Sequence, residues 1–439
     1  MMQIDLPLRQ RPRVHWVSPL PPGETDIANY TLRILPELTR LAEVILWTDT
    51  PDWDPALENI CQVRQLDPDQ VLPADLQTAI APHSGESIFI HIGNSWLFHS
   101  GFLRLAHRLP AVIVLHDLAI QELCRDMVRF DNQSPDLYLS EMEKWYGEPG
   151  AEAGRKFLND DITPYNLVAT MPGFEIALGR ACAVLTHTDA AFAAVKARTD
   201  LPCYQLNLPY PARAHHWPRP KRISDRLRLV QFGYIGPNRR PEQILEALAE
   251  VRHEIDFRFD ILGKLWNPAY VQNRIDDLGL TDRVHLHGFV KEQVLDEMLA
   301  ESHLVFNLRF PTMGEASGSQ LRIWDSAAAS VVSDHAWYAG LPDDTVFKVA
   351  TDDDTAGLIS LLHRLASDRS LGRDIGEKGR SHLLQTHRPD HYAQGIVKIA
   401  SEFALHGRRS LYQRSARQVL APGNEEVFDY SALVNKVIW

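Results

Sequence analysis

Short apolar runs alternate with helix-length amphipathic stretches along most of this chain, and this alternation is its most constraining feature. We expect strands at residues 13–18, 43–48, 87–93, 111–116 and 181–187, and again at 228–232, 256–262, 283–287, 303–308 and 330–334. Helical periodicity fills the gaps, as in 26–41, where Ile27, Tyr30 and Ile34 fall on one face. Further helices are expected at 96–107, from Pro241, after Gly318, and twice between Thr355 and Thr386. Strands that alternate with helices in this way predict a parallel α/β fold.

A proline-rich stretch divides the strands into two sets. Residues 209–220 contain four prolines and no apolar period, which is typical of an interdomain linker. A chain of 439 residues is long enough for two or three domains. We therefore expect two Rossmann-like, doubly wound domains facing each other across a cleft. Their expected bounds are 1–212 and 213–400. A tail follows over 401–439, and one path that we expect for it is to cross back to the first domain.

Composition narrows the class of protein. The chain is 45% apolar and 23% charged, which is ordinary for a globular protein. Its net charge of −12 argues against a nucleic-acid binder, which presents a basic face to phosphates. Four cysteines without Cys-x-x-Cys spacing predict neither a zinc knuckle nor a redox pair. With no signal-peptide pattern and no apolar run of the ~20 residues that a membrane span needs, we expect a cytoplasmic protein.

One stretch, from Cys124 to Phe174, has weak periodicity and is rich in polar and aromatic residues. A long non-periodic insert is often a lid or an acceptor-binding loop. A set of surface helices is the equally weighted alternative.

Polar loops follow several of the expected strands in the second half, where ligands bind in this fold class. Gly233 and Gly236 lie in the loop that ends with Arg239 and Arg240, two arginines suited to bidentate binding of a diphosphate. Lys264, after the next strand, would add a third positive charge. The alternative is a solvated basic turn.

A second loop of this half opens a helix with small residues. Ser317, Gly318 and Ser319 stand where unpaired N–H groups point at an anion. Glu315, just before them, is poorly suited to phosphate but well suited to accept hydrogen bonds from sugar hydroxyls.

In the first half, two polar segments follow expected strands. Asn94 lies in the first segment, and His99 lies one helical turn beyond it. His116 and Asp117 form the second segment. A lone histidine is more often structural than catalytic, so from the residues alone His116 stays evenly balanced between these readings.

Between residues 52 and 69, two Asp-x-Asp pairs have the spacing that holds a divalent metal on a diphosphate. They are Asp52 with Asp54 and Asp67 with Asp69. In a chain with 57 acidic residues this spacing is common, and both pairs lie in a connector rich in proline and aspartate. We therefore expect no metal and no cofactor. A Walker loop, a Gly-x-Gly-x-x-Gly motif and a Gly-x-Ser-x-Gly elbow are all missing from the sequence.

Taken in order, several segments resemble retaining glycosyltransferases of family 4, which have the GT-B fold. The segments are Ser18-Pro19-Leu20-Pro21-Pro22, Gly93-Asn94-Ser95 with His99, His116-Asp117, Leu185-Thr186-His187-Thr188, Pro311-Thr312-Met313-Gly314-Glu315-Ala316-Ser317-Gly318-Ser319 and Trp337-Tyr338-Ala339-Gly340-Leu341-Pro342-Asp343-Asp344. The resemblance runs from about residue 13 to about residue 400.

The resemblance implies a metal-independent enzyme that moves a sugar from a GDP-, UDP- or ADP-sugar to a saccharide or lipid-linked acceptor in surface polysaccharide assembly. The first domain would bind the acceptor and the second the donor. His116 would lie near the transferred sugar, with Asn94, His99 and Asp117 on the acceptor side. Arg239 falls where the family has a diphosphate-binding lysine, and Glu315 where it has the glutamate that contacts the donor sugar.

Some positions depart from the family pattern. Tyr234 stands where an arginine is frequent, Asp26 where glycine is usual, and Ala327-Ala328-Ala329 where Gly-x-Pro is common. Ile323 stands at the position of a second glutamate, on a helix that also carries Arg322 and Asp325. These departures leave room for a non-catalytic GT-B scaffold or regulatory subunit. A sugar-nucleotide epimerase on the same architecture is a more distant alternative.

The tail carries a basic cluster, with Arg408, Arg409, Arg414 and Arg417 beside Leu411 and Tyr412. The net charge of −12 favours a solvated or domain-crossing helix. Peripheral contact of residues 408–417 with anionic lipid at the inner face of the membrane is the alternative.

Overall fold

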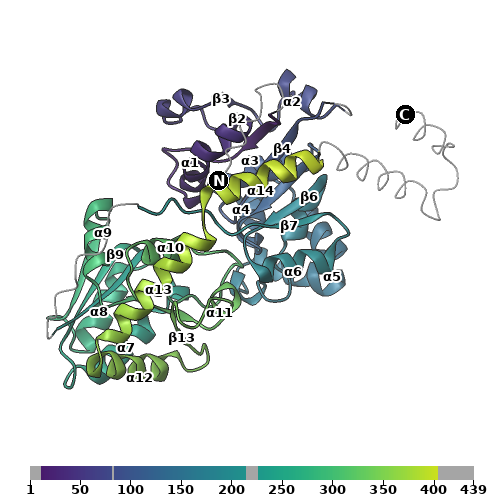
Figure 1. The fold of residues 1–439 in the computed structure, drawn as a ribbon. Coiled ribbons are helices and arrows are strands. Elements are labelled where there is room, and N and C mark those ends of the chain that lie inside the picture. The colour runs from purple at the N-terminus through teal and green to yellow at the C-terminus, as the bar shows by residue number, and fades with distance from the viewer. Residues whose placement is uncertain (1–10, 82–83, 214–225, 404–439) are drawn as a thin grey trace. The chain divides into compact units, whose positions relative to one another are not determined.

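The structure is a computed structural model that describes residues 11–81, 84–213 and 226–403 (Figure 1). The chain forms two compact units. The first comprises Met1–Pro209, Met313–Glu315 and Pro389–Trp439, and the second comprises Tyr210–Thr312 and Ala316–Arg388. The basic cluster 408–417 and most of the proline-rich linker lie outside the described residues.

The first unit is built on a parallel sheet of seven strands in the order β3-β2-β1-β4-β5-β6-β7. Its strands are β1 (Arg13–Val17), β2 (Glu43–Thr48), β3 (Gln62–Gln65), β4 (Ser87–Ile92), β5 (Ala111–Leu115), β6 (Ala181–Thr186) and β7 (Cys203–Gln205). The five strands expected in this half are confirmed. The sequence analysis did not predict β3 and β7, because these edge strands are short and carry few apolar residues.

The helices of the first unit are α1 (Asp26–Leu41), α2 (Ala74–Ala79), α3 (Trp96–Ala106), α4 (Gln121–Phe130), α5 (Pro135–Leu158), α6 (Asp189–Arg198) and α14 (Pro389–Glu402). Short 3-10 turns are η2 (Pro55–Asn59), η3 (Pro164–Asn166) and η4 (Phe174–Leu178). The weakly periodic stretch is largely helical, as the surface-helix reading had it. Its pattern is interrupted because α5 kinks at Gly147, where φ is 71°.

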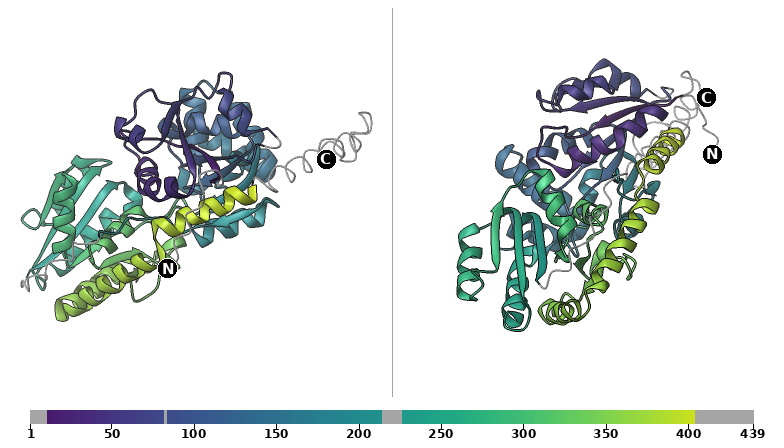
Figure 2. Two further views of the ribbon diagram at one scale, coloured as in Figure 1. Left: turned by 45° about the horizontal axis from the view of Figure 1, so that its top comes forward. Right: turned by 60° about the vertical axis from the view of Figure 1, so that its left-hand side comes forward.

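Helix α14 belongs to the first unit, although the expected boundary at 400 placed it in the second. It lies along α1 in Figures 1 and 2, and the Tyr392 hydroxyl is 2.5 Å from that of Tyr30 on α1. Both tyrosines are buried. The apolar face of α14 therefore packs on the first unit, which moves the boundary back to Arg388–Pro389.

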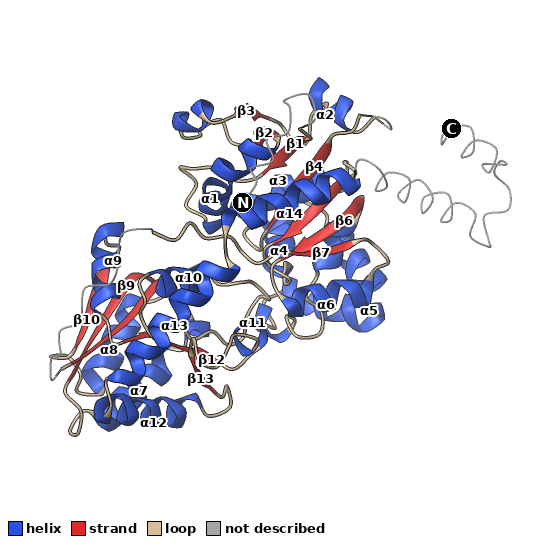
Figure 3. Cartoon of the chain, in the orientation of Figure 1, coloured by secondary structure: helices blue, strands red, loops and turns tan. Residues whose placement is uncertain are grey.

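The second unit has a parallel sheet of six strands in the order β10-β9-β8-β11-β12-β13 (Figure 3). Its strands are β8 (Leu227–Ile235), β9 (Phe257–Leu265), β10 (Val284–Gly288), β11 (Leu304–Phe306), β12 (Ser330–Ser333) and β13 (Phe347–Val349). Its helices are α7 (Pro241–Val251), α8 (Pro268–Asp277), α9 (Glu292–Glu301), α10 (Gly318–Asp325), α11 (Ala336–Ala339), α12 (Asp354–Ser367) and α13 (Ser370–Thr386), with the 3-10 turn η5 (Pro237–Arg239). All of these strands except β13 are expected from the sequence.

Strands β8 and β9 stay paired as far as Ile235 and Leu265, beyond the expected ends of both strands. Gly233 and Gly263 lie side by side there, with φ values of 101° and 123°. A side chain at Gly263 would collide with the backbone of Gly233. Glycine at these two positions therefore lets the pair of strands carry its following loops past the edge of the sheet.

Both units are doubly wound parallel α/β folds. Near-continuous apolar strands such as β5, in which every residue is buried, are covered on both faces by helices. The expected α/β class, with two doubly wound domains, is confirmed.

Candidate functional site

In each unit the strand order reverses at one place, and this reversal locates a crevice at the carboxyl ends of the strands. In the second unit the reversal falls between β8 and β11, which pair directly. The loop after β8 contains Gly236 and η5, and β11 is followed directly by Asn307. The predicted phosphate-binding residues therefore lie at the switch point of this sheet.

A chain of hydrogen bonds joins the elements at this point. Arg239 Nη1 donates to Asn307 Oδ1 at 2.9 Å, and Asn307 Nδ2 donates to Gln320 Oε1 at 2.9 Å. Gln320 in turn donates its backbone N–H to Ser317 Oγ at 3.1 Å. All four residues are buried. The network fixes the guanidinium of Arg239 beside the N-terminus of α10, so two predicted donor-binding segments come together.

The N-terminus of α10 has the geometry expected of an anion site. Ser317 is the N-cap, and its hydroxyl satisfies one of the first N–H groups of the helix. Gly318 and Ser319 occupy the first turn, whose N–H groups have no partner within the helix and lie at the positive end of its dipole.

Arg240 has a different environment from Arg239. Its guanidinium forms a bidentate ion pair with Asp354 at 2.5 and 2.9 Å, and its backbone is left-handed, with φ 58°. The pair fastens the start of α7 to the start of α12. Because the Asp354 carboxylate already neutralises its charge, Arg240 anchors the loop. The guanidinium of Arg239 is instead held by the side-chain amide of Asn307.

Lys264 lies at the end of β9, directly opposite Tyr234 in the register of the two strands. Both side chains are exposed. Tyr234 stands where the resemblance leads us to expect an arginine, and Lys264 supplies a cation at this end of the strand pair.

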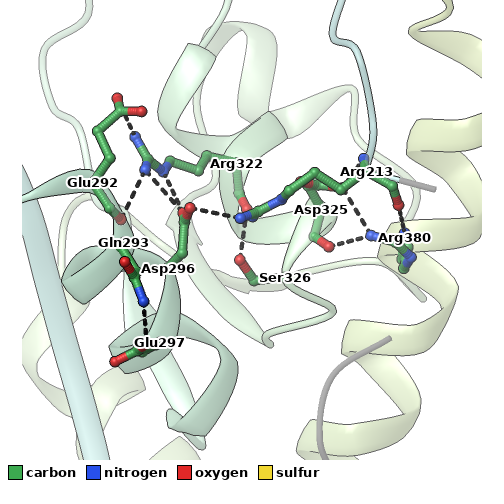
Figure 4. Close-up of polar contacts among 9 residues, drawn as sticks. All are labelled: Arg213, Glu292, Gln293, Asp296, Glu297, Arg322, Asp325, Ser326 and Arg380. Atoms are coloured by element: carbon green, nitrogen blue, oxygen red, sulfur yellow. Dashed lines mark hydrogen bonds and ion pairs between the residues drawn. The ribbon is translucent and has the colours of Figure 1, made fainter. Parts of the chain in front are cut away.

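On α10, Ile323 stands where the resemblance leads us to expect a second glutamate, and the polar residues beside it have structural partners. Ile323 is fully buried in the core. Asp325, also buried, accepts from Arg213 Nε at 2.6 Å and from Arg380 Nη1 at 2.8 Å (Figure 4). Arg322 donates to Asp296 at 2.9 Å. Neither Arg322 nor Asp325 stands in for the missing glutamate, because both belong to a clamp that ties Arg213, where the chain enters this unit, to α9, α10 and α13.

In the first unit the reversal of strand order falls between β1 and β4. Asp117, two residues beyond β5, accepts the Asn94 backbone N–H at 2.8 Å. The Asn94 side chain donates to Glu122 at 2.8 Å and accepts from the backbone N–H of Leu123 at 3.2 Å. The predicted residues Asn94 and Asp117 are thus brought together, and they brace the loop after β4 against the start of α4.

His99 lies beneath this loop. It is 1% exposed, and its Nδ1 is 3.1 Å from the carbonyl oxygen of His91. Burial lowers the pKa of His99 to about 4, against the opposing effect of that hydrogen bond. His99 is therefore neutral at physiological pH and supports the loop from inside.

His116 is half-buried directly after β5. Its Nε2 is 2.9 Å from Nδ1 of His91, and its ring lies 4.8 Å from Tyr30 and 5.0 Å from His187, centroid to centroid. Burial, and then repulsion from the imidazoles of His187, His91 and His99, holds the pKa of His116 well below its usual value. It offers a neutral imidazole, not a cation.

Glu315 is grouped with the first unit through the short segment Met313–Glu315. The backbone N–H groups of Leu118 and Ala119 both donate to the Met313 carbonyl at 2.8 Å. One oxygen of Glu315 accepts the Met313 N–H at 2.7 Å. This turn gives the buried carboxylate a fixed direction.

One member of each of these two Asp-x-Asp pairs stabilises local structure. Asp54 caps η2 by accepting from Ala56 N at 2.9 Å, and Asp67 accepts from Asp69 N at 2.9 Å. Within residues 11–81, 84–213 and 226–403, no group of three or more His, Cys, Asp or Glu side chains is arranged to hold a metal ion.

Sequence reasoning did not find several residues of these edges: Asn307, Gln320, Asp354, His91 and Glu122. Asn307 directly follows a strand, and Gln320 stands three residues after an N-cap serine. Their positions in the sequence could therefore have indicated both as site residues. His91 sits inside a strand, where only the fold reveals that it faces His116.

Residues 216–318 match the family model described as glycosyl transferases group 1, and this segment contains the loop after β8, Asn307 and the start of α10. No curated protein sequence matches the chain.

Solved structures share its fold. Anabaena Alr3699/HepE in complex with UDP and glucose has a TM-score of 0.59 at 13% identity, over 89% of this chain and 100% of that one. Sucrose-phosphate synthase from Thermosynechococcus elongatus has a TM-score of 0.56 at 13% identity, over 90% and 99%. WaaG, a glycosyltransferase involved in lipopolysaccharide biosynthesis, has a TM-score of 0.52 at 16% identity, over 87% and 99%.

At these identities the structural likeness establishes the fold, and the chain has the GT-B fold. The family match over residues 216–318 and this fold together support a GT-B glycosyltransferase. No helix of the part of the chain that the structure describes has the length and apolar character needed to cross a membrane.

Proposed function

We propose that this protein is a retaining glycosyltransferase of family 4 that moves a sugar from a nucleotide-sugar donor to a saccharide or lipid-linked acceptor in surface polysaccharide assembly. The observation that carries the proposal is the chain of hydrogen bonds from Arg239 through Asn307 to Gln320 at the switch point of the second sheet. It aims a guanidinium beside the first turn of α10. The glycosyl transferases group 1 match over residues 216–318, which include Arg239 and Asn307, supports it.

The donor diphosphate is assigned to a cradle formed by Arg239 and the first turn of α10. Breaking the bond from the sugar to the diphosphate builds negative charge on the leaving phosphate. Arg239, with the N–H groups of Gly318 and Ser319, stabilises that charge, because preorganised donors cost no reorganisation during the reaction. Lys264 adds a more distant positive charge from the end of β9.

The transferred sugar is assigned to His116 and Glu315. The carboxylate of Glu315 accepts hydrogen bonds from sugar hydroxyls, and neutral His116 exchanges a hydrogen bond with a sugar oxygen. Retention of configuration needs no protein nucleophile if the acceptor attacks from the face that the phosphate leaves, because the leaving phosphate then takes the acceptor's proton. No metal takes part in this scheme.

A panel of GDP-, UDP- and ADP-sugars tests the proposal, read first by thermal shift and then by product analysis. Turnover with one donor, unchanged by EDTA, is the expected result. Stabilisation by a nucleotide without turnover would instead support a scaffold or regulatory subunit. Conversion of the free sugar nucleotide to an isomer would support an epimerase.

A substitution of Glu315 sharpens the same assay. Glu315→Ala removes the carboxylate proposed for the sugar but leaves the diphosphate cradle intact. Turnover should fall by about 100-fold, as for loss of one preorganised contact, while the thermal shift with the nucleoside diphosphate alone persists. Full activity, or activity that EDTA abolishes and manganese restores, would show that the site is misplaced.

A further inference from the structure

The carboxyl ends of β4, β5 and β6 gather three histidines whose rings touch in series. His91 comes from β4, His116 follows β5 and His187 follows β6. The ring centroids of His91 and His116 are 5.2 Å apart, and those of His116 and His187 are 5.0 Å apart. Tyr30 closes the group with its edge against His116. His91 has so far had no part in the proposed function, yet its only hydrogen bond through Nδ1 among the described residues is to His116.

The direction of that hydrogen bond follows from the other nitrogen of His91. Its Nε2 is buried and has no hydrogen-bond partner in the described residues. A buried N–H without a partner is rare, while an unpaired acceptor is tolerated better. The proton of neutral His91 therefore sits on Nδ1, so His91 donates to Nε2 of His116.

The neighbouring histidines follow the same pattern. His187 Nδ1 lies 3.0 Å from the Leu206 carbonyl and His99 Nδ1 lies 3.1 Å from the His91 carbonyl. A carbonyl only accepts, so both rings carry their proton on Nδ1. The Nε2 of His187 is then an unpaired buried acceptor like that of His91. All the imidazoles around His116 are thus neutral and fixed in one tautomer.

We propose that His91 is a positioning residue that locks His116 in the Nδ1–H tautomer, so that His116 presents a neutral hydrogen-bond donor to a ligand oxygen. Because Nε2 of His116 accepts from His91, the single proton of a neutral His116 must sit on Nδ1. His116 then neither removes a proton through that nitrogen nor carries a positive charge. That the ligand oxygen belongs to the transferred sugar rests on the proposed function; the tautomer does not.

The low pKa values of the group agree with this geometry. Burial, and then the charges that the neighbouring histidines would carry, keeps the pKa of both His91 and His116 well below the usual range. The pKa of His187 is lowered to about 4 by burial. Among the described residues, the rings of His91, His187 and Tyr30 contact His116, and His99 also acts on its pKa; none of these four side chains is a carboxylate.

Solid-state NMR of protein labelled with ¹³C and ¹⁵N in histidine tests the tautomer without any substrate. His116→Gln assigns the His116 signal by removing it. In the wild type, Nδ1 of His116 should have the shift of a protonated nitrogen and Nε2 that of an unprotonated one. In His91→Leu the two tautomers should mix, whereas His91→Asn, whose amide NH₂ replaces the Nδ1 donor, should keep the wild-type pattern.

Turnover then measures the consequence. His91→Leu should lower kcat/KM by about tenfold, the size expected from one misdirected hydrogen bond, and His91→Asn should restore most of it. Tyr392→Phe is the matched control, since it removes a hydroxyl from the same buried group without touching the bond between His91 and His116. Its kcat/KM should equal that of the wild type.

The two proposals fail in distinguishable ways. A protonated Nε2 on wild-type His116, or an unchanged tautomer in folded His91→Leu, overturns the positioning role whatever the activity. Absence of turnover with every sugar nucleotide, together with the expected NMR pattern, overturns the proposed function and leaves the positioning role standing. Circular dichroism and thermal melting establish that each variant is folded.

Discussion

The two sheets of this protein have the same strand order around their switch points, but their carboxyl edges carry different chemistry. In the first unit the side chains that meet there include the neutral imidazoles of His91, His116 and His187. In the second unit they include the guanidinium of Arg239 and the amides of Asn307 and Gln320. The same backbone plan thus offers neutral hydrogen bonding in one unit and a directed positive charge in the other.

The interactions that stabilise each unit near this edge also differ. Neutral hydrogen bonds contribute about 1 kcal/mol each, whereas breaking a buried ion pair leaves an uncompensated charge. We therefore expect the second unit to be sensitive to the loss of single charges, and the first to be sensitive to the gain of charge by protonation.

The largest expected effect is on the clamp at the entry to the second unit. Asp325→Ala leaves buried Arg380 without its carboxylate and should lower the free energy of unfolding by about 3–5 kcal/mol. Asp296→Ala removes a more exposed carboxylate of the same network and should cost about 1 kcal/mol or less. Urea unfolding read by pulse proteolysis, with fragments of the second unit identified by mass spectrometry, compares the two. Equal costs would mean that burial does not control this network.

Acid should weaken the first unit through its histidines. Burial lowers the folded-state pKa of His99 and His187 to about 4, below the unfolded value of 6.5, so the unfolded state binds protons first as the pH falls. Stability is therefore complete above pH 6.5 and is lost progressively down to about pH 4. Between pH 7 and pH 5 each histidine should cost about 2 kcal/mol.

The His187→Asn variant isolates one of these contributions. Asparagine keeps a donor for the Leu206 carbonyl but does not titrate in this range. Pulse proteolysis of the first unit at pH 7 and pH 5 should show a pH dependence about 2 kcal/mol smaller in this variant than in the wild type. An identical pH dependence would show that His187 is not the neutral, buried group described above.

Loss of the directed charge should be felt in turnover more than in folding. Arg239→Ala should reduce turnover by about 100-fold or more, because it removes a preorganised contact to the leaving phosphate. Arg228→Ala is the control, since Arg228 lies near the other end of β8 and pairs with Glu301. Steady-state rates with the accepted sugar nucleotide decide; equal activity of both variants would place the diphosphate elsewhere.

The smallest expected effect is in the first unit, at a hydrogen bond between two neutral hydroxyl groups. Tyr392→Phe removes the hydroxyl that lies 2.5 Å from that of Tyr30 and should cost about 1 kcal/mol. The matching substitution Tyr30→Phe should cost about the same. Thermal melts of both variants test this, and a loss as large as that of Asp325→Ala would remove the contrast between neutral and charged networks.

How much the sequence predicted differs between elements for physical reasons. Strands such as β5 have every residue buried, so a continuous apolar run marked them. Strands β3, β7 and β13 are short and lie at sheet edges, where most of their residues are exposed or only partly buried, and no run of apolar residues marked them. The kink at Gly147 hid α5 in the same way, because it broke the helical period.

At the site, the loops were predictable and the partners of the side chains were not. Arg239 and Arg240 are adjacent and of one type, and the sequence treated them alike. The structure separates them: Arg239 meets Asn307, 68 residues away, and Arg240 meets Asp354, 114 residues away. Such pairings depend on which loops the sheet order brings together.

The sequence by itself determined the α/β class, the two-unit plan and the loops where polar residues gather, because local apolar periodicity and strand ends are written in consecutive residues. Only the tertiary structure decided that α14 returns to the first unit, that Asp325 binds Arg213 and Arg380, and that His91 faces His116. Those outcomes depend on contacts between residues far apart in the chain. They also depend on burial, which keeps the histidines neutral, and on side-chain partners, which hold the arginines in place.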